Sequence, residues 1–337
     1  MKTIAFFTNS SGAGKTHLVY HLAWMFSDLG HNVLAADLDP QSILSSTFLK
    51  DPELEVLWPD AGPRRTIFGG VDRLLNNVED TAADRPVGIS ENLSLIAGDP
   101  RLAGLEQRFS EAWSNCLADG GRAGDGLRVT TVFCQVIQVA AASVGSQYVF
   151  MDLGPNLGSV NRAALIAADF LVIPLASDMY SAQALRSLGP ALREWRAGWR
   201  QRRSTVAATG LSLPLGEMST LGYILIEPSM RENLPYRAPM KWVDIVPRVY
   251  AQEMAEQEAS PISDGEAQHR LFRLRRPVGL DHYARDARKP IFDLSPADGA
   301  FGGYAAAVQD CKKDFKTLAK KIMTFTGGEP KRPLDDD

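Results

Sequence analysis

The sequence predicts an α/β fold in which a doubly wound, mostly parallel sheet carries helices on both faces. Short apolar runs alternate with helical patterns along the chain, which is typical of parallel strands joined by crossover helices. The runs carry few polar residues, as expected of strands that are covered on both faces. The runs that we interpret as buried strands are residues 3–8, 32–36, 148–153, 170–175 and 221–226.

The first helix of this pattern is predicted between the first two apolar runs, at residues 15–29. Its apolar side chains recur at spacings of four, three and four residues and form one face of an α-helix. These side chains are Leu18, Leu22, Met25 and Leu29. Gly30 follows them and is a typical helix stop. Strand, helix and strand together form one βαβ unit.

The chain of 337 residues, 45% of them hydrophobic, has enough apolar material for one large core or two smaller ones. We expect a single domain over residues 1–326, with an insertion at about 50–100 that is rich in Pro, Gly and Asp. The insertion is expected to hold one helix and a short strand at 93–96. Three later segments are expected to be an exposed polar connection, an amphipathic closing helix and a disordered tail, at residues 253–268, 308–325 and 327–337.

Composition excludes several classes of protein. A net charge of −4 and a pI near 5.8 mean that the whole molecule is not a cationic partner for nucleic acid or anionic lipid, so any such contact requires a local patch. Cys116, Cys134 and Cys311 lack CxxC or CxxH spacing, so we expect a reducing compartment and no metal bound by cysteine. No signal-peptide pattern and no apolar stretch long enough to cross a bilayer occur, which predicts a cytoplasmic protein without an integral membrane segment.

A loop of small residues follows the first predicted strand and leads into the first predicted helix. In this context the backbone can curl so that successive N–H groups point inward, and the helix N-terminus adds positive partial charge. Phosphate is the natural ligand of such a nest, with Lys15 reaching the β- and γ-phosphates and the Thr16 hydroxyl binding Mg²⁺. The predicted nucleotide-binding residues are Ser10, Ser11, Gly12, Ala13, Gly14, Lys15, Thr16 and His17.

The loop sequence alone leaves a second interpretation open, a strand-to-helix turn eased by glycine, because Asn9 stands where the full pattern has glycine. Carboxylates at the ends of neighbouring strands favour nucleotide binding, since open α/β sheets place ligands at the carboxyl ends of their strands. Asp37 and Asp39 follow the second apolar run, and Asp152 follows the core of the third. One such acid is often structural, but three acids beside a phosphate loop indicate a site for magnesium and a triphosphate.

Together these motifs resemble the ParA/MinD/Soj family of ATPases, which have a deviant Walker A loop, an Asp-x-Asp-Pro-Gln motif and a Walker B strand that ends in Asp. The matching segments are residues 10–16, 37–41, 150–158, 161–165, 168–169, 173–175 and 287–292, and the closing helix. The resemblance implies a P-loop NTPase of the ParA/MinD type that binds ATP and Mg²⁺. It implies that Lys15 contacts the phosphates during catalysis and that Asp39 orients or deprotonates the attacking water. Thr16, Asp37 and Asp152 are then expected to support the magnesium.

One position departs from the family pattern. The family's loop begins with a signature lysine that reaches the partner's phosphates across a nucleotide-sandwiched dimer, and Ser10 stands at that position here. The resemblance implies an ATP-dependent homodimer and a partner or activator protein, often encoded nearby, but leaves the contact across the dimer open. Serine here also resembles the branch of the family that positions carboxysomes. Without a second cation the γ-phosphate is less stabilised, so we expect hydrolysis to be slow and partner-stimulated, or absent.

A stripe of arginines is predicted on one helix in the second half of the chain. Within residues 188–203, leucines and tryptophans recur at helical spacing and predict a side that faces the core. Arginines recur one position later and form a parallel stripe. Two interpretations stay open, non-specific binding of DNA phosphates and a solvated helix face. The stripe consists of Arg193, Arg196, Arg200 and Arg203, with Arg202 beside it.

The leading functional hypothesis is an ATP-switched protein for partitioning or intracellular positioning of DNA or a protein cargo. In this hypothesis ATP favours a dimer that binds DNA or another surface, and hydrolysis stimulated by a partner releases it. The alternative is a nucleotide-gated interaction or assembly protein with little turnover, which Ser10 favours. A third hypothesis, a metabolic enzyme that uses ATP to activate a carboxylate, needs a substrate pocket that the sequence does not reveal.

Overall fold

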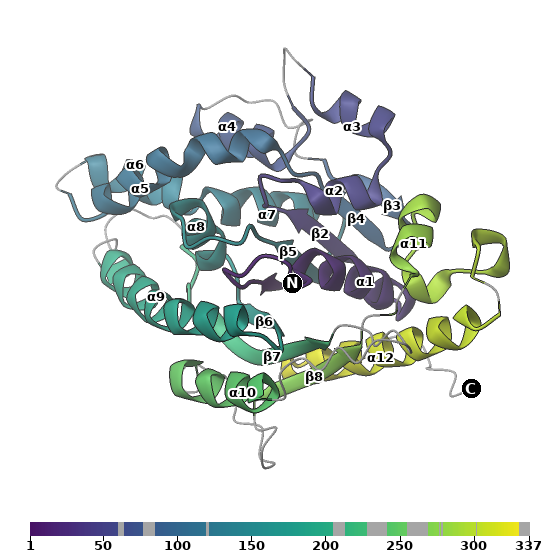
Figure 1. Ribbon diagram of the computed structural model, residues 1–337. Helices are drawn as coiled ribbons and strands as arrows, with labels where there is room; N and C mark the ends of the chain where they lie inside the picture. The colour runs from purple at the N-terminus through teal and green to yellow at the C-terminus, as the bar shows by residue number, and fades with distance from the viewer. Residues whose placement is uncertain are drawn as a thin grey trace.

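An eight-stranded sheet forms the centre of the computed structural model, which describes residues 1–337 except 60–63, 77–84, 119–120, 205–212, 228–240, 255–268, 276, 278, 301 and 330–337 (Figure 1). The strand order is β3-β4-β2-β5-β1-β6-β7-β8, and every neighbouring pair is parallel except β3 with β4. The strands are β1 (Lys2–Phe6), β2 (Val33–Asp37), β3 (Val87–Ser90), β4 (Leu93–Ile96), β5 (Tyr148–Asp152), β6 (Phe170–Ala176), β7 (Ser219–Glu227) and β8 (Arg270–Arg275).

The order of the strands creates a switch point beside β1. The chain leaves β1 for β2 on one side, and later leaves β5 for β6 on the other. The register pairs Phe6 with Asp152 and Asp37 with Asp152, so β1, β2 and β5 end level with one another. The loops that follow these three strands therefore meet at one edge of the sheet, where doubly wound folds bind their ligands.

Helices cover both faces of the sheet and enclose two buried clusters of apolar side chains. Helices α4–α10 pack on one face, while α1–α3, α11 and α12 pack on the other (Figure 1). Successive residues of β1 alternate between the clusters, because strand side chains point to opposite faces. The helices are α1 (Lys15–Asp28), α2 (Ile43–Phe48), α3 (Asp51–Leu57), α4 (Ile67–Leu75), α5 (Glu106–Asn115), α6 (Gly121–Thr130), α7 (Val132–Ser143), α8 (Ser159–Ile166), α9 (Met179–Ser204), α10 (Lys241–Met254), α11 (Asp281–Ala287) and α12 (Tyr304–Phe325).

The fold class and the five strands predicted from apolar runs are confirmed, with strand ends within two residues of those of β1, β2, β5, β6 and β7. The sequence analysis did not predict the two edge strands, β3 and β8. β8 has arginine at three of its six positions, and only its buried leucines join the core. An edge strand has fewer covered positions, so it lacks the continuous apolar run that marks a central strand.

Residues 50–100 hold more structure than the sequence predicted. The strand expected at 93–96 is confirmed as β4, which pairs with β2 and so belongs to the central sheet. Two helices, α3 and α4, replace the single helix that we expected. The first turn of α4 is capped by the Thr66 hydroxyl, which accepts from the Gly69 N–H at 3.2 Å.

Later segments agree with the sequence where the structure describes them. The closing helix is confirmed as α12, which begins four residues before the predicted start at residue 308. Residues 253 and 254 end α10 and are not part of a connection, and the rest of the expected connection, like residues 330–337, lies outside the described residues. In the described part of the chain no single helix is long and apolar enough to span a membrane, and one pair bent by 52°, α6 with α7, qualifies only when both helices are counted together.

Candidate functional site

The predicted phosphate loop connects β1 to α1 at the carboxyl edge of the sheet (Figure 1). Gly12 and Gly14 have φ of 75° and 73°, a left-handed conformation that glycine adopts without strain. A Cβ at Gly14 would also lie 2.8 Å from Cδ1 of Ile226 on β7, so this position requires glycine for space as well. Glycine at both positions lets the loop turn sharply into the N-terminus of α1, as a phosphate nest requires.

Lys15 is the cation of this loop. Its side chain is 7% exposed, and its Nζ donates a hydrogen bond to the carbonyl oxygen of Ser10 at 3.1 Å. Burial lowers the pKa of Lys15, while the negative charges of Asp152 and Asp39 act in the opposite direction. The lysine therefore lies between the loop backbone and two acids, poised to exchange its carbonyl partner for a phosphate oxygen.

Thr16 and Asp152, two of the predicted magnesium-binding residues, contact each other in the structure. The Thr16 hydroxyl donates to Oδ2 of Asp152 at 2.6 Å, and Oδ1 of Asp152 is buried without a hydrogen-bond partner among the described residues. Burial raises the pKa of Asp152 well above its usual range, and the charges of Asp37 and Asp39 raise it further. A buried, unsatisfied carboxylate oxygen fits a site that takes a metal or its bound water.

No group of three or more His, Cys, Asp or Glu side chains in the described part of the chain can hold a metal by itself. Mg²⁺ usually binds one or two protein ligands and fills its remaining positions with phosphate oxygens and water. The contact between Thr16 and Asp152, and the Oδ1 of Asp152 that no described residue hydrogen-bonds, fit that mode of binding, and the assignment stays a prediction.

Asp37 has a different environment from the one that we predicted. Its Oδ2 accepts from the N–H and the hydroxyl of Ser45, at 2.8 and 2.7 Å, and its Oδ1 accepts from the N–H of Asp39 at 3.3 Å. Burial raises the pKa of Asp37 to about 7, against these hydrogen bonds. The contacts give Asp37 a structural role, since they fix α2 to the end of β2, and its magnesium role stays a prediction.

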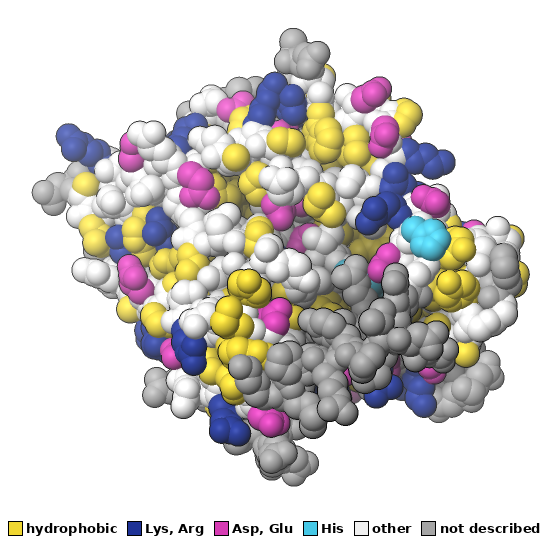
Figure 2. Space-filling view, in the orientation of Figure 1, with side chains coloured by type: hydrophobic (Ala, Val, Ile, Leu, Met, Phe, Trp, Pro, Cys, Tyr) yellow, Lys and Arg dark blue, Asp and Glu magenta, His cyan; other side chains and the backbone are white. Residues whose placement is uncertain are grey.

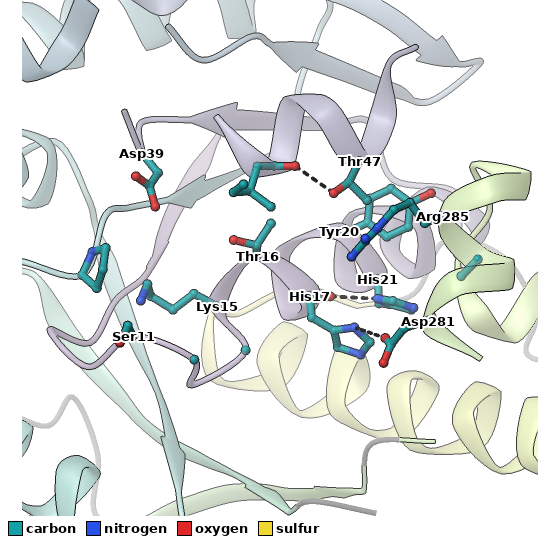
Figure 3. Close-up of a pocket in the computed structure, with 15 residues that line it drawn as sticks. Ser11, Lys15, Thr16, His17, Tyr20, His21, Asp39, Thr47, Asp281 and Arg285 are labelled. Carbon is teal, nitrogen blue, oxygen red and sulfur yellow. Dashed lines mark hydrogen bonds and ion pairs between the residues drawn. The ribbon is translucent and has the colours of Figure 1, made fainter. Parts of the chain in front are cut away.

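Asp39 lies closer to the opening of the site, with 8% of its surface exposed. Its Oδ1 accepts from the N–H of Gln41 at 2.9 Å, which orients the carboxylate. The backbone of Gly154, just after β5, passes so close that a Cβ there would lie 3.2 Å from the same oxygen. The sequence placed Asp39 at the attacking water, and the structure puts its carboxylate in the same cavity as Lys15 and Thr16 (Figure 3).

This cavity has a volume of about 300 Å³ and extends from the phosphate loop to α11. The sequence did not predict its far wall, because α11 lies more than 260 residues after the loop and carries no recognisable motif. The His17 ring, predicted with the phosphate loop, faces this wall, with Nδ1 3.7 Å from Oδ1 of Asp281 (Figure 3). The wall and floor residues that sequence reasoning missed are Tyr20, His21, Ile43, Thr47, Pro155, Asp281, Ala284 and Arg285.

The arginine stripe of α9 is largely engaged within the molecule. Arg196 donates to the carbonyl oxygens of Glu217, at 2.7 Å, and Met218, and burial followed by the charge of Arg200 lowers its pKa to about 10. Arg203 donates to the carbonyl of Leu215 at 3.1 Å. These contacts fasten α9 to the segment before β7, which is a packing role.

The remaining arginines of this helix differ in exposure. Arg193 donates to the carbonyl of Glu253 at 2.8 Å and is exposed, as is Arg200. Arg202, which we placed beside the stripe, is only 8% exposed and donates to the carbonyl of Trp113 at 2.7 Å, so it is not a surface residue. On the face shown in Figure 2, lysines and arginines are spread around the rim among acidic side chains.

Fold and site together define a class of protein: a doubly wound P-loop protein in which the loop, Lys15, Thr16 and Asp39 line one cavity and Asp152 is hydrogen-bonded to Thr16 behind it. Residues 1–202 match the AAA domain family. The chain belongs to that family, and this match together with its relatives identifies it as a P-loop ATPase of the ParA/MinD type.

Relatives whose names refer to partitioning are among the curated proteins that this chain matches. The chain is 29% identical over 211 residues to the protein IncC of Escherichia coli, covering 63% of this chain and 50% of IncC. It is 27% identical over 204 residues to the probable plasmid-partitioning protein ParA of Thermus thermophilus, covering 59% of this chain and 52% of ParA. The chain thus spans about half the length of these curated relatives.

Among solved structures, a substituted Cyanothece McdA in complex with ATP superposes with a TM-score of 0.63 at 17% identity, over 99% of both chains. At this identity the likeness supports the fold alone. It extends beyond the family match at residues 1–202 and includes the C-terminal part, where α11 and α12 lie.

Proposed function

We propose that this protein is an ATP-dependent switch for partitioning or positioning DNA or a protein cargo. One observation carries the proposal: Lys15, Thr16 and Asp39 line one cavity, and the Thr16 hydroxyl donates to the buried Asp152 behind it, although these residues come from three separate loops and strand ends. Relatives that partition plasmids support the cellular role. The expected cytoplasmic location stays a prediction.

The site's own residues suggest how it would act on ATP. The amides of the loop before Lys15 would bind the β- and γ-phosphates, and the Lys15 ammonium would add a charge-assisted contact. Bound Mg²⁺, held through Thr16 and Asp152, would neutralise phosphate charge. Asp39, oriented by the N–H of Gln41, would hold the attacking water and accept its proton.

Ser10 bears on the rate of this reaction. Its carbonyl accepts from Lys15 of the same chain, and its hydroxyl lies 3.4 Å from the carbonyl oxygen of Ser11, so the position supplies no positive charge to a second subunit. We therefore propose a homodimer that forms with ATP and turns over slowly unless a partner protein assists. The alternative, a nucleotide-gated assembly protein with little turnover, is favoured by the same serine.

A titration of ATP followed by size-exclusion chromatography, with and without Mg²⁺, tests binding and dimerisation together. We expect a shift to twice the monomer mass with ATP and Mg²⁺ and no shift with ADP. Phosphate release in the presence of candidate partners then separates a switch from an assembly protein. A chain that binds no ATP at any magnesium concentration would remove both functions.

We propose a DNA-binding surface that uses only the exposed arginines of the stripe on α9. Arg200 is exposed on α9, and Arg193 is exposed but pairs with Glu253 of α10. Arg196 and Arg203 hold the helix to the segment before β7. Changing Arg200 to Glu should weaken salt-sensitive, ATP-stimulated retention of DNA, because contacts to phosphates are chiefly electrostatic. The matched control changes Arg122, exposed on α6, to Glu. Equal retention by the two variants would exclude α9 as the DNA surface.

A further inference from the structure

The first turn of α8 is held by an acid from another helix. Oε2 of Glu106, at the start of α5, accepts from the N–H of Ser159 at 2.7 Å and from the N–H of Val160 at 3.3 Å. The Ser159 hydroxyl, which has a single proton to donate, lies 2.6 Å from this oxygen and 2.5 Å from the Glu106 carbonyl oxygen. The residue that precedes α8 is Gly158, which has no side chain to cap it. Helix N-terminal amides lack partners within the helix, so Glu106 satisfies two of them and places its negative charge at the positive end of the helix.

The backbone at Gly158 leaves room for the side chain of Glu106. A Cβ at Gly158 would lie 2.5 Å from Oε1 of Glu106 and 2.7 Å from Oδ1 of Asn156. Any side chain at position 158 would therefore push the acid or the loop away. Glycine at this position lets the carboxylate approach the helix end directly.

A chain of hydrogen bonds connects this helix end to the nucleotide cavity. Asn161 of α8 is 1% exposed, and its Nδ2 donates to the carbonyls of Gly154 and Asn156, at 2.8 Å each. Gly154 is the residue whose backbone lies against the Asp39 carboxylate, and Pro155 lines the cavity itself. The position of α8 thus sets the position of residues 153–158 over Asp39.

Helix α5 is firmly fixed, so it can serve as the support. The ring of Phe109 stacks on that of Phe133 of α7 with centroids 5.2 Å apart. The Trp113 ring has the guanidinium carbons of Arg162, from α8, and Arg202, from α9, at 4.3 and 3.8 Å from its centroid. Such cation–π contacts tie α5 to both neighbouring helices.

We propose that Glu106 is a positioning residue of the nucleotide site: by holding the first turn of α8 it fixes residues 153–158 against Asp39. Its effect on turnover rests on the proposed function, but its effect on the loop does not. Removal of the carboxylate leaves the amides of Ser159 and Val160 without their cap, and the loop before them gains freedom. Glu106 is not among the described residues that line the cavity, so it would act on the site through the loop.

Hydrogen exchange in the nucleotide-free protein tests the first part. In Glu106→Ala, amides within residues 153–161 should exchange at least about tenfold faster than in the unchanged protein, because exchange reports local opening. Glu106→Gln, which keeps a carbonyl acceptor without the charge, should give an intermediate rate. The control is Glu111→Ala, on the exposed side of the same helix. Unchanged exchange in Glu106→Ala, or equal acceleration in the control, would overturn the proposal.

Binding and turnover test the second part. Glu106→Ala should bind ATP with a Kd within about twofold of the unchanged protein, since the phosphate loop is intact, while phosphate release at saturating ATP falls about tenfold. A purely structural defect would weaken binding and turnover together. If the unchanged protein releases no phosphate, the proposed ATPase function fails, and the exchange rates still decide whether Glu106 holds the loop.

Discussion

Replacing Lys15 with alanine removes the cation of the phosphate loop and should weaken ATP binding by about 10- to 150-fold. A hydrogen bond to a charged group contributes about 1.5–3 kcal/mol, and about 1.4 kcal/mol corresponds to tenfold in Kd. The upper half of that interval is expected, because Lys15 is only 7% exposed and its charge is little screened by water. Its loss also leaves Asp152 and Asp39 without their neighbouring cation, so they repel the triphosphate more strongly.

Isothermal titration calorimetry with a non-hydrolysable ATP analogue and Mg²⁺ measures the effect. The matched control is Lys2→Ala, which removes the same charge at the opposite end of β1. Thermal unfolding of each variant establishes that it is folded. A Kd for Lys15→Ala within about twofold of the control, in a folded protein, would refute the assignment of the phosphate loop.

Three further changes test other parts of the structure. In the folded protein the pKa of Asp37 is raised from 3.8 to about 7, so the carboxyl group contributes its full stabilisation below about pH 4 and loses it as the pH rises through 7. The loss is on the order of 4 kcal/mol. Urea unfolding without nucleotide should therefore show a free energy of unfolding that falls from pH 5 to 8, and a rise would contradict the conclusion that burial raises this pKa. In Thr16→Ala, the factor by which Mg²⁺ strengthens ATP binding, relative to binding in EDTA, should fall about tenfold, because the hydroxyl ligand is lost. Thr16→Ser keeps the hydroxyl and should preserve this factor. An unchanged factor in Thr16→Ala would exclude the hydroxyl from the metal site. Trp113→Ala should lower the free energy of unfolding by about 3 kcal/mol, because it removes the ring against which Arg162 and Arg202 pack; a loss under about 1 kcal/mol by urea unfolding would show that the ring contributes little.

The strands and the phosphate loop were predictable because each leaves a local pattern in the sequence. A buried parallel strand is a continuous apolar run, and the loop from Ser10 to Thr16 combines glycines, lysine and threonine in an order that only a strand-to-helix context makes useful. Edge strand β8 left no such pattern, since its exposed positions carry arginine. The helices of residues 50–100 were undercounted because α3 and α4 are short and proline and glycine interrupt their periodicity.

The arginine stripe shows what helical periodicity cannot decide. Helical spacing correctly placed Trp199 in the core, but it could not say that a segment before β7 accepts hydrogen bonds from Arg196 and Arg203. A stripe beside a core face meets either solvent or a neighbouring element, and only the tertiary arrangement decides which.

The sequence by itself predicted the class of fold and the edge of the sheet at which the loop before Lys15 meets Asp39 and Asp152, because β1, β2 and β5 run parallel and bring their carboxyl ends to one edge. The tertiary structure alone decided the surroundings of each acid: Asp39 lines the cavity, Asp37 accepts from Ser45, and the buried Asp152 keeps an oxygen without a hydrogen bond among the described residues. It also brought α11 to the cavity and Glu106 to α8. Such contacts join residues far apart in the chain, and their geometry depends on how whole helices pack, which no local pattern records.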